Sequence, residues 1–305
     1  MWLGAHLGIS GGLADAVREA RKIGCESLQI FSKSPQMWSG PPIAPAAAEE
    51  FRVAVGVEGI RATAVHHAYL ANLASPKPFM LQRSRTAFVD EMHRADLLGV
   101  DALIFHPGAH LGSGVEAGVR TIAESLRLAL EKFPEGRVQL LLENAAGQGT
   151  TLGSRFEELA SVLAQVNRPD RLGVTLDTCH LFAAGFDFRD EHGYGEMMDQ
   201  VERVLGRGTV RAFHLNDAKA ELGSHLDRHE NIGKGEIGLE GFRHIVNDPR
   251  WAATPGYLET PLDEQGYARY AADLKTLRSL APGNDALAPA RKPARRSRSH
   301  GSTVK

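Results

Sequence analysis

The chain has few of the residues that would cross-link a small protein or anchor it in a membrane. Only two of its 305 residues are cysteines, Cys25 and Cys179, and neither belongs to a CxxC pair. A disulfide framework and a zinc cage of thiolates are therefore not expected. The sequence has no signal-peptide pattern at its start and no apolar run near the roughly 20 residues that cross a bilayer. We expect a cytoplasmic protein without a membrane partner, associated with the nucleoid if bacterial.

The chain also lacks a strong excess of charge, since its formal net charge is -2. The charge is uneven, however. Residues 281–305 contain six Lys or Arg against one Asp, so this tail carries +5 and residues 1–280 carry -7. The tail is rich in Pro, Ala, Ser and Arg without apolar periodicity, which predicts disorder. It is either a solubilising appendage or an auxiliary nucleic-acid contact, and the tail alone does not decide between them.

Short apolar runs alternate with helical stretches such as ADAVREARKIG and FEELASVLAQV up to about residue 280. Eight β-then-α units without a break in composition predict one α/β domain, a (β/α)8 TIM barrel over residues 1–280. An open doubly wound sheet is the alternative. The expected strands are Leu3–His6, Ser27–Phe31, Ala62–His66, Ala102–His106, Val138–Glu143, Leu172–Asp177, Val210–His214 and Tyr257–Glu259.

Six of these strands end in a residue that can bind a metal. In a barrel such ends meet on the C-terminal face, where catalytic groups gather. One histidine at a strand end is more often a hydrogen-bonded structural residue. Six such groups buried without partners would each cost several kcal/mol, and a shared cation removes that penalty. The six are His66, His106, Glu143, Asp177, His214 and Glu259.

Three further candidate ligands lie in nearby loops. His180 follows Asp177 by three residues in LDTCH, and Asp227 and His229 alternate in HLDRHENIG. His225 shares their parity, so alternation alone leaves open whether it is also a ligand. Nine ligands with one bridging carboxylate match three metals, because a catalytic zinc usually takes about three protein ligands. Nitrogen-rich ligation without thiolate favours zinc, with manganese or iron as substitutes.

Three metals suit an in-line displacement at phosphorus. Two metals roughly 3.5 to 4 Å apart hold the attacking hydroxide and stabilise the leaving oxygen, and a third binds the phosphate oxygens. The four carboxylates contribute about -4 and three divalent cations about +6, so the loaded pocket is cationic although the surrounding domain is acidic.

Several segments are distinctive as whole motifs: VHHAYLANLASP, IFHPGAHLG, LLENAAGQGTTLG, VTLDTCHLFAAGFD, FHLNDAKAELGSHLDRHENIGKGEIG and LETP. Together they resemble endonuclease IV, the trinuclear-zinc apurinic/apyrimidinic endonuclease family. The resemblance runs from GAHLGISGGL to about residue 278 and covers all but the basic tail. It implies a xylose-isomerase-like TIM barrel with the active site at the C-terminal face of its strands.

The resemblance also implies a reaction and a set of ligands. The reaction is cleavage of DNA on the 5' side of an abasic site, leaving a 3'-hydroxyl and a 5'-deoxyribose phosphate, together with removal of blocking groups from 3' ends. The partner is damaged double-stranded DNA, bound by a monomer. Zinc would be held by His66, His106 and Glu143, by Glu143, Asp177, His214 and Glu259, and by His180, Asp227 and His229. The nucleophile is a hydroxide that bridges metals; Glu143 is the bridging carboxylate and Glu259 orients the hydroxide.

Two loops match the loops with which this family binds DNA. Tyr69 and Leu70 in HHAYLANL match the loop that enters the helix beside the lesion. The second loop, FSKSPQMW, contains Lys33 and departs from the family pattern at Gln36, where an arginine fills the gap in the base stack. Glutamine lacks the planar cation, so weaker DNA binding is expected.

Two other functions compete with this one. A sugar isomerase or dehydratase of the related barrels also uses the quartet Glu143, Asp177, His214 and Glu259. Such an enzyme has no need for the other five ligands. A non-catalytic DNA-binding module is supported by the basic tail only. Among the remaining histidines, His6 is expected in the pocket without binding metal, His67 is expected to pack away from it, and His225 is expected at the surface.

Overall fold

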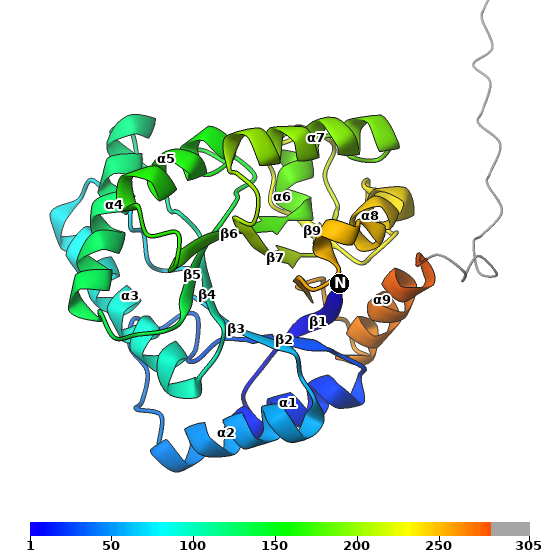
Figure 1. The fold of residues 1–305 in the computed structure, drawn as a ribbon, viewed down its shortest axis with the longest axis horizontal. Helices are drawn as coiled ribbons and strands as arrows, with labels where there is room; N and C mark the ends of the chain where they lie inside the picture. Colours follow the sequence, from blue (N-terminus) through cyan, green and yellow to red (C-terminus); the bar gives the residue numbers. More distant parts are fainter. Residues whose placement is uncertain (282–305) are drawn as a thin grey trace, which may run out of the picture.

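The computed structural model describes residues 1–281, and within them the predicted barrel is confirmed (Figure 1). Eight parallel strands close in the order β1-β10-β7-β6-β5-β4-β3-β2, so the open-sheet alternative is wrong. All strand ends lie within two residues of the predicted ones. The strands are β1 (Trp2–Leu7), β2 (Ser27–Ile30), β3 (Ala62–His66), β4 (Ala102–Phe105), β5 (Gln139–Glu143), β6 (Leu172–Asp177), β7 (Val210–His214) and β10 (Pro255–Leu258).

The helices form a layer around the outside of the barrel (Figure 1). Glycine is the C-cap of two of them; the helix Pro78–Leu98, for example, is capped by Gly99, whose φ of 68° is left-handed. None of the helices in residues 1–281 has the length and apolar character needed to cross a membrane. They are α1 (Leu13–Lys22), α2 (Pro45–Glu58), α3 (Pro78–Leu98), α4 (Val115–Lys132), α5 (Phe156–Val166), α6 (Thr178–Ala183), α7 (Glu191–Val204), α8 (Gly238–Asn247), the 3-10 turn η1 (Pro249–Trp251) and α9 (Ala268–Ser279).

Two elements depart from the simple β-then-α repeat. The short helix α6 directly follows β6, and a two-residue antiparallel pair, β8 (Asp217–Ala218) with β9 (His229–Glu230), follows β7. Both lie beyond the C-terminal ends of their strands. The predicted basic tail, residues 281–305, falls outside the described residues except for Ala281.

Alternation along the strands decides which side chains reach the barrel interior. A small apolar cluster fills the interior, separate from the larger core between strands and helices; its members are Ala64, Ala102, Ile104, Leu141, Ala212 and Tyr257. Because side chains alternate with period two, the residues two positions further on share that interior face. Those residues are His66, His106, Glu143, His214 and Glu259. The predicted ligands therefore form the layer above an apolar floor.

Candidate metal centre

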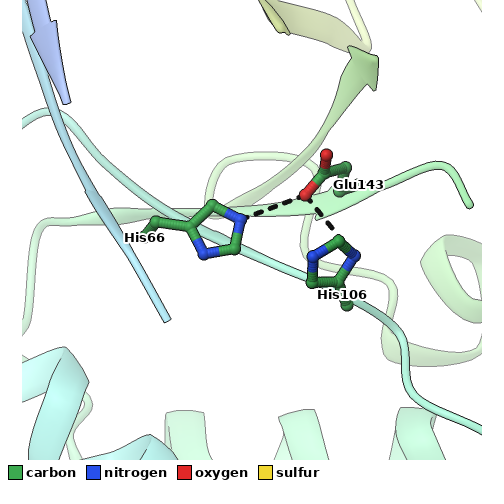
Figure 2. Close-up of side chains that lie close together, drawn as sticks. All are labelled: His66, His106 and Glu143. Atoms are coloured by element: carbon green, nitrogen blue, oxygen red, sulfur yellow. Dashed lines mark hydrogen bonds and ion pairs between the residues drawn. The ribbon is translucent and has the colours of Figure 1, made fainter. Parts of the chain in front are cut away.

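The first ligand group joins three neighbouring strands. His66 ends β3, Glu143 ends β5, and His106 directly follows β4. His66 Nε2 lies 3.1 Å from Glu143 Oε2, and His106 Nδ1 lies 3.6 Å from the same oxygen (Figure 2). Their ligand atoms all lie within 4.8 Å of one another, so one cation fits among them.

The second group shares Glu143 with the first. The other Glu143 oxygen, Oε1, lies 2.7 Å from His214 Nδ1, which is also 3.5 Å from Glu259 Oε2 and 3.9 Å from Asp177 Oδ2. Glu143, Asp177 and His214 are fully buried. One oxygen of Glu143 thus faces each group, which is the geometry of a bridging carboxylate.

The third group is built by α6 and by the β8–β9 pair. Asp177 is the N-cap of α6, and its Oδ1 accepts a hydrogen bond from His180 N at 2.8 Å, which fixes His180 one turn beyond β6. His180 Nε2 lies 3.2 Å from Asp227 Oδ2, and His229 Nε2 lies 3.1 Å from Asp227 Oδ1. These three residues come together although about fifty residues of chain separate His180 from the others.

The histidines are oriented as metal ligands require, with one ring nitrogen held by the protein and the other free. The Nδ1 atoms of His66, His180 and His229 contact the carbonyl oxygens of His67, Asn144 and Glu259 at 2.8, 2.9 and 3.2 Å. Each Nδ1 is therefore held as a hydrogen-bond donor, and each Nε2 faces the carboxylates, where it can hold a proton or, in its place, a metal. His229 Nε2 is buried and faces oxygens of Asp227 and Asp177 at 3.1 and 3.7 Å. The donor set therefore fits metal cations.

The buried carboxylates and imidazoles of the site shift one another's pKa values. Burial alone raises the pKa of Glu143, but the neighbouring His214 and His106 outweigh it and hold the pKa well below its usual value. Burial alone lowers the pKa of His214, but Glu259 and Glu143 reverse this and raise the pKa to about 9. The pKa of His229 rises to about 9 because the hydrogen bond to Asp227 and the charge of Asp177 outweigh its burial.

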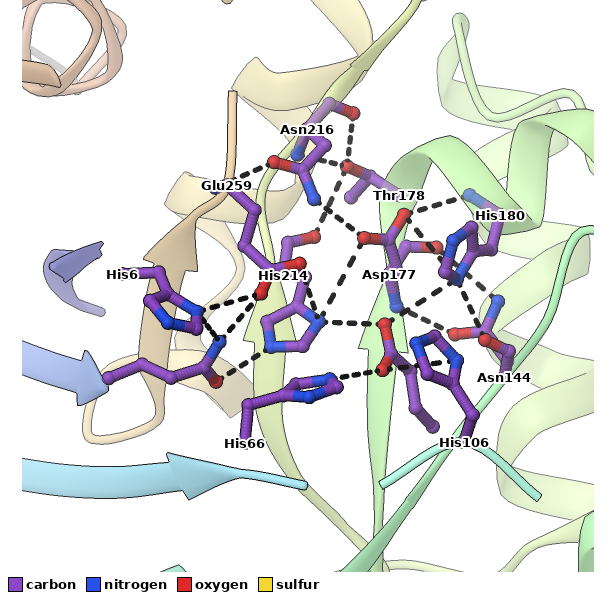
Figure 3. A network of polar contacts seen from close by, with 12 residues as sticks. His6, His66, His106, Asn144, Asp177, Thr178, His180, His214, Asn216 and Glu259 are labelled. Atoms are coloured by element: carbon purple, nitrogen blue, oxygen red, sulfur yellow. Dashed lines mark hydrogen bonds and ion pairs between the residues drawn. The ribbon is translucent and has the colours of Figure 1, made fainter. Parts of the chain in front are cut away.

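Further polar side chains, which are not themselves predicted ligands, hold the ligands in place (Figure 3). Asn144 Oδ1 accepts from Asp177 N at 2.6 Å. Asn216 donates to Asp177 Oδ2 at 2.6 Å and accepts from Glu259 N at 2.8 Å. Gln29, on β2, contacts both His214 and Glu259. Asn144 and Asn216 stand one or two residues after strand-end ligands, and Gln29 is a lone amide in the apolar run SLQIF, so each leaves a weak signal in the sequence.

The other histidines lie largely as expected. His6 Nδ1 is 3.2 Å from Glu259 Oε1, so His6 lies in the pocket beside a predicted ligand (Figure 3). His67 is buried against Phe88 of α3. His225 is exposed, with Nδ1 3.0 Å from the carbonyl oxygen of Ala146.

The alternation in HLDRHENIG does not describe one extended strand. His225 has a left-handed φ of 55°, and strand β9 begins only at His229. Asp227 and His229 nevertheless meet because the loop folds back toward α6. Cys179 lies near Asp177 and His229, but its buried thiol points to the carbonyl oxygen of Arg228, and burial together with Asp177 raises its pKa. The thiol thus already has a backbone hydrogen-bond partner.

The predicted DNA-binding residues differ in exposure. Tyr69 is 59% exposed and Leu70 is 38% exposed, and the Tyr69 ring lies 5.6 and 5.7 Å from the rings of His66 and His106. Tyr69 thus lies at the rim of the metal centre, and Leu70 follows it in the chain. Gln36 is exposed as well. Their contact with DNA stays a prediction.

The side chain of Lys33 is buried, whereas a direct DNA contact requires an exposed cation. Its side chain is only 2% exposed, and its ammonium pairs with Glu91 and lies 3.6 Å from Asp90, both on α3. Arg94 of the same helix donates to Ser32 O at 2.6 Å and to Pro41 O at 2.9 Å. In this structure Lys33 thus belongs to a buried network that ties the β2–α2 loop to α3, and its placement gives no support to a direct phosphate contact.

The comparisons with known proteins agree with the site. A family model described as xylose isomerase-like TIM barrel matches residues 17–280. A probable endonuclease 4 of Chloroflexus aurantiacus is 44% identical over 280 residues, which cover 92% of this chain and 98% of the relative. A probable endonuclease 4 of Chlorobium luteolum is 46% identical over 269 residues, which cover 87% of this chain and 95% of the relative.

Solved structures give the same result. The crystal structure of endonuclease IV from Thermus thermophilus matches with a TM-score of 0.80 and 35% identity, over 92% of this chain and 98% of that chain. D-psicose 3-epimerase from Clostridium cellulolyticum matches with a TM-score of 0.64 but only 16% identity, over 92% and 99%, which shows a shared fold alone. This chain therefore belongs to the endonuclease IV family of xylose isomerase-like TIM barrels.

Proposed function

We propose that the protein is a zinc-dependent endonuclease that cuts double-stranded DNA on the 5' side of abasic sites. The products are a 3'-hydroxyl and a 5'-deoxyribose phosphate end, and the same site removes blocking groups from 3' ends. The protein works as a monomer with three zinc ions. One observation carries the proposal: nine ligand residues lie in three adjoining groups, two of which share Glu143.

The chain's own residues would divide the work of hydrolysis. When bound, divalent cations supply an activated water and neutralise phosphate charge. Glu259 is held rigidly, because its backbone N–H donates to Asn216 at 2.8 Å and its Oε1 lies 2.7 Å from Gln29 Nε2. Its other oxygen, Oε2, faces His214 in the second group at 3.5 Å. Glu259 is therefore placed to orient the attacking water, and its lowered pKa, set by His214 and His6 against its burial, keeps it ionised.

The rim supports DNA as the substrate. Tyr69 is an exposed large side chain directly beside His66 and His106, and the next residue, Leu70, is exposed as well. An apolar or aromatic wedge is what unstacks a duplex, and unstacking is easiest where a base is already missing. Flipping of the abasic nucleotide would then bring its phosphate to the first ligand group.

The sugar isomerase alternative has one observation in its favour. The quartet Glu143, Asp177, His214 and Glu259 forms a metal-sized group by itself. Such an isomerase needs one or two metals there. It leaves unexplained why His66 and His106 form a second group, and why His180, Asp227 and His229 form a third. The fully assembled set favours the nuclease.

Nicking of a duplex that contains one tetrahydrofuran abasic analogue tests the proposal. Strand cleavage at the analogue should disappear after prolonged chelation and return with zinc, and metal analysis should find about three zinc per chain. Isomerisation of a keto sugar, with one or two manganese or magnesium ions, would support the isomerase instead. DNA binding unaffected by chelation, without nicking, would support a non-catalytic module.

Glu259→Gln tests the role of the orienting carboxylate. This variant should fold and bind DNA, yet lose at least about a hundredfold in turnover, since the group acts on the transition state. Glu196→Gln changes an exposed glutamate on α7, where its side chain is 71% exposed, and should keep full activity. Near-parental turnover by Glu259→Gln would remove the role assigned to Glu259.

A further inference from the structure

Gln29 is a polar side chain at a buried position, where an amide without hydrogen-bond partners destabilises the fold. It lies on β2 with its side chain fully buried, and the neighbours in its strand are the core residues Leu28 and Ile30. Strand register pairs it with His6 of β1. A buried amide without partners costs several kcal/mol, so its contacts explain why it is tolerated.

The contacts of Gln29 determine the orientation of its amide. The atom nearest Glu259 Oε1, at 2.7 Å, must be the amide nitrogen, because an ionised carboxylate only accepts hydrogen bonds. The amide oxygen then faces His214 Nε2 at 2.9 Å. Since an amide oxygen only accepts, His214 Nε2 must carry a proton. The free nitrogen of His214 is therefore Nδ1.

His214 Nδ1 faces only negative groups. Oxygens of Glu143, Glu259 and Asp177 lie 2.7, 3.5 and 3.9 Å from it. Such a nitrogen needs either a proton or a cation. In His66, His180 and His229 the arrangement is reversed, because Nδ1 is held by a backbone carbonyl and Nε2 faces the carboxylates. For His214 a side chain takes the place of the backbone carbonyl.

We propose that Gln29 is the positioning residue of the second ligand group: it fixes His214 with Nε2 protonated and Nδ1 toward the metal, and with the same amide it fixes the carboxylate of Glu259. One rigid amide thus aligns a metal ligand and the residue that orients the water. The inference rests on the proposed metal-dependent function. Gln29 has no metal-binding side chain and is not part of the ligand groups, so it acts through the residues that its amide contacts, His214, Glu259 and His6.

Two substitutions separate the two halves of this role. Gln29→Met keeps the length of the side chain and removes the amide hydrogen bonds to His214 and Glu259, together with the contact to His6 Nδ1. Gln29→Glu keeps an acceptor for His214 Nε2 but replaces the donor to Glu259 with a second oxygen. Gln139→Met is the matched control, because Gln139 is another barrel-strand glutamine, on β5, whose amide bonds to Asp170 O and Arg211 rather than to the site.

Proton NMR of the imidazole N–H groups gives a readout that does not depend on activity. The parent, with or without zinc, should show a slowly exchanging His214 Nε2–H signal, assigned by its absence from His214→Asn. Gln29→Met should lose this signal, release zinc to a chelator about 10- to 100-fold faster, and fall in kcat more than in KM. Gln29→Glu should keep the signal but have a lower kcat. Gln139→Met should match the parent in the N–H signal, in the rate of zinc release and in kcat and KM.

Persistence of the His214 Nε2–H signal and of parental zinc release in Gln29→Met would overturn the inference. If Gln29→Met fails to fold, loss of the signal in Gln29→Glu would overturn it as well, because that variant retains the acceptor. Failure of the proposed function looks different. A parent that shows the signal but neither binds about three zinc ions nor nicks abasic DNA would refute the function and leave the role of Gln29 intact.

Discussion

Removal of the metals should produce a protein whose stability falls as the pH rises from about 6.5 to about 9. In the metal-free chain, protonated histidines balance the negative charge of the buried carboxylates. His214 lies 2.7 Å from Glu143 and 3.5 Å from Glu259, and His229 lies 3.1 Å from Asp227. Burial works against the charged imidazoles, but these carboxylates prevail and raise both pKa values to about 9.

The sign and size follow from proton linkage. A histidine with a raised pKa in the folded state stabilises the fold fully below its unfolded pKa of 6.5, and this contribution is lost as the pH rises through 9. A pKa unit corresponds to about 1.36 kcal/mol, so the shift of His214 alone amounts to about 3 kcal/mol. His229 acts in the same direction. The pKa values of Glu143, Asp227 and Glu259 are lowered, so these carboxylates change stability only in acid.

Urea unfolding of chelator-treated protein at about pH 5.5 and about pH 9 measures this effect. The metal-free protein should lose about 3 kcal/mol between the two, because the raised pKa values of His229 and His180 offset the opposite effect of His6, His67 and His106, whose pKa values are lowered. Zinc-loaded protein is the control: its ligands are already deprotonated, so its stability should not fall over this window. His192→Gln removes an exposed histidine and should leave the pH profile unchanged. A metal-free stability that stays flat or rises with pH would refute the charge balance described for His214 and His229.

Three other perturbations test separate parts of the structure. His229→Ala should lose about one zinc per chain, whereas His225→Ala should keep its full content by metal analysis; equal losses would contradict the assignment. Gln36→Arg should bind an abasic duplex more tightly than the parent in a titration, because a planar cation stacks on bases. Glu91→Gln removes the nearest carboxylate of the buried Lys33 ammonium, which leaves only the more distant Asp90 at 3.6 Å among its described ion pairs, and should cost about 3 kcal/mol in unfolding experiments. The exposed pair of Arg85 with Glu124 provides the control, since Glu124→Gln should cost less than about 1 kcal/mol.

Much of the site followed from where the polar residues stand in the sequence. A parallel barrel brings all strand ends to one face, so a ligand-type residue after each apolar run is enough to predict that His66, His106, Glu143 and Asp177 gather there. Period-two alternation then decides orientation, and His67 accordingly packs on the other side, against Phe88. These predictions needed only local rules.

Other features of the site could not be predicted from local sequence rules, because they depend on the tertiary fold. Lys33 looks like a surface cation by residue type, but α3 places Glu91 on its ammonium from 58 residues away. His225 shares the parity of Asp227 and His229, but parity has meaning only in an extended strand, and its φ of 55° breaks that strand. The contacts of Gln29 with residues 185 and 230 positions away left no local pattern beyond one amide among apolar residues.

The arrangement of the site links stability to metal binding. Glu143, Asp177 and His214 are fully buried above an apolar floor that includes Ala64 and Ala212. Because burial shields these carboxylates from solvent, their charge must be balanced by cations of the protein or by bound metals. Histidine suits both the metal-free and the metal-loaded protein, because the ring nitrogen that binds a proton in the first can bind a metal in the second. The ligand set thus depends on bound protons at low pH and on bound metals at higher pH, so a metal-loaded protein should be the more stable form at neutral and alkaline pH.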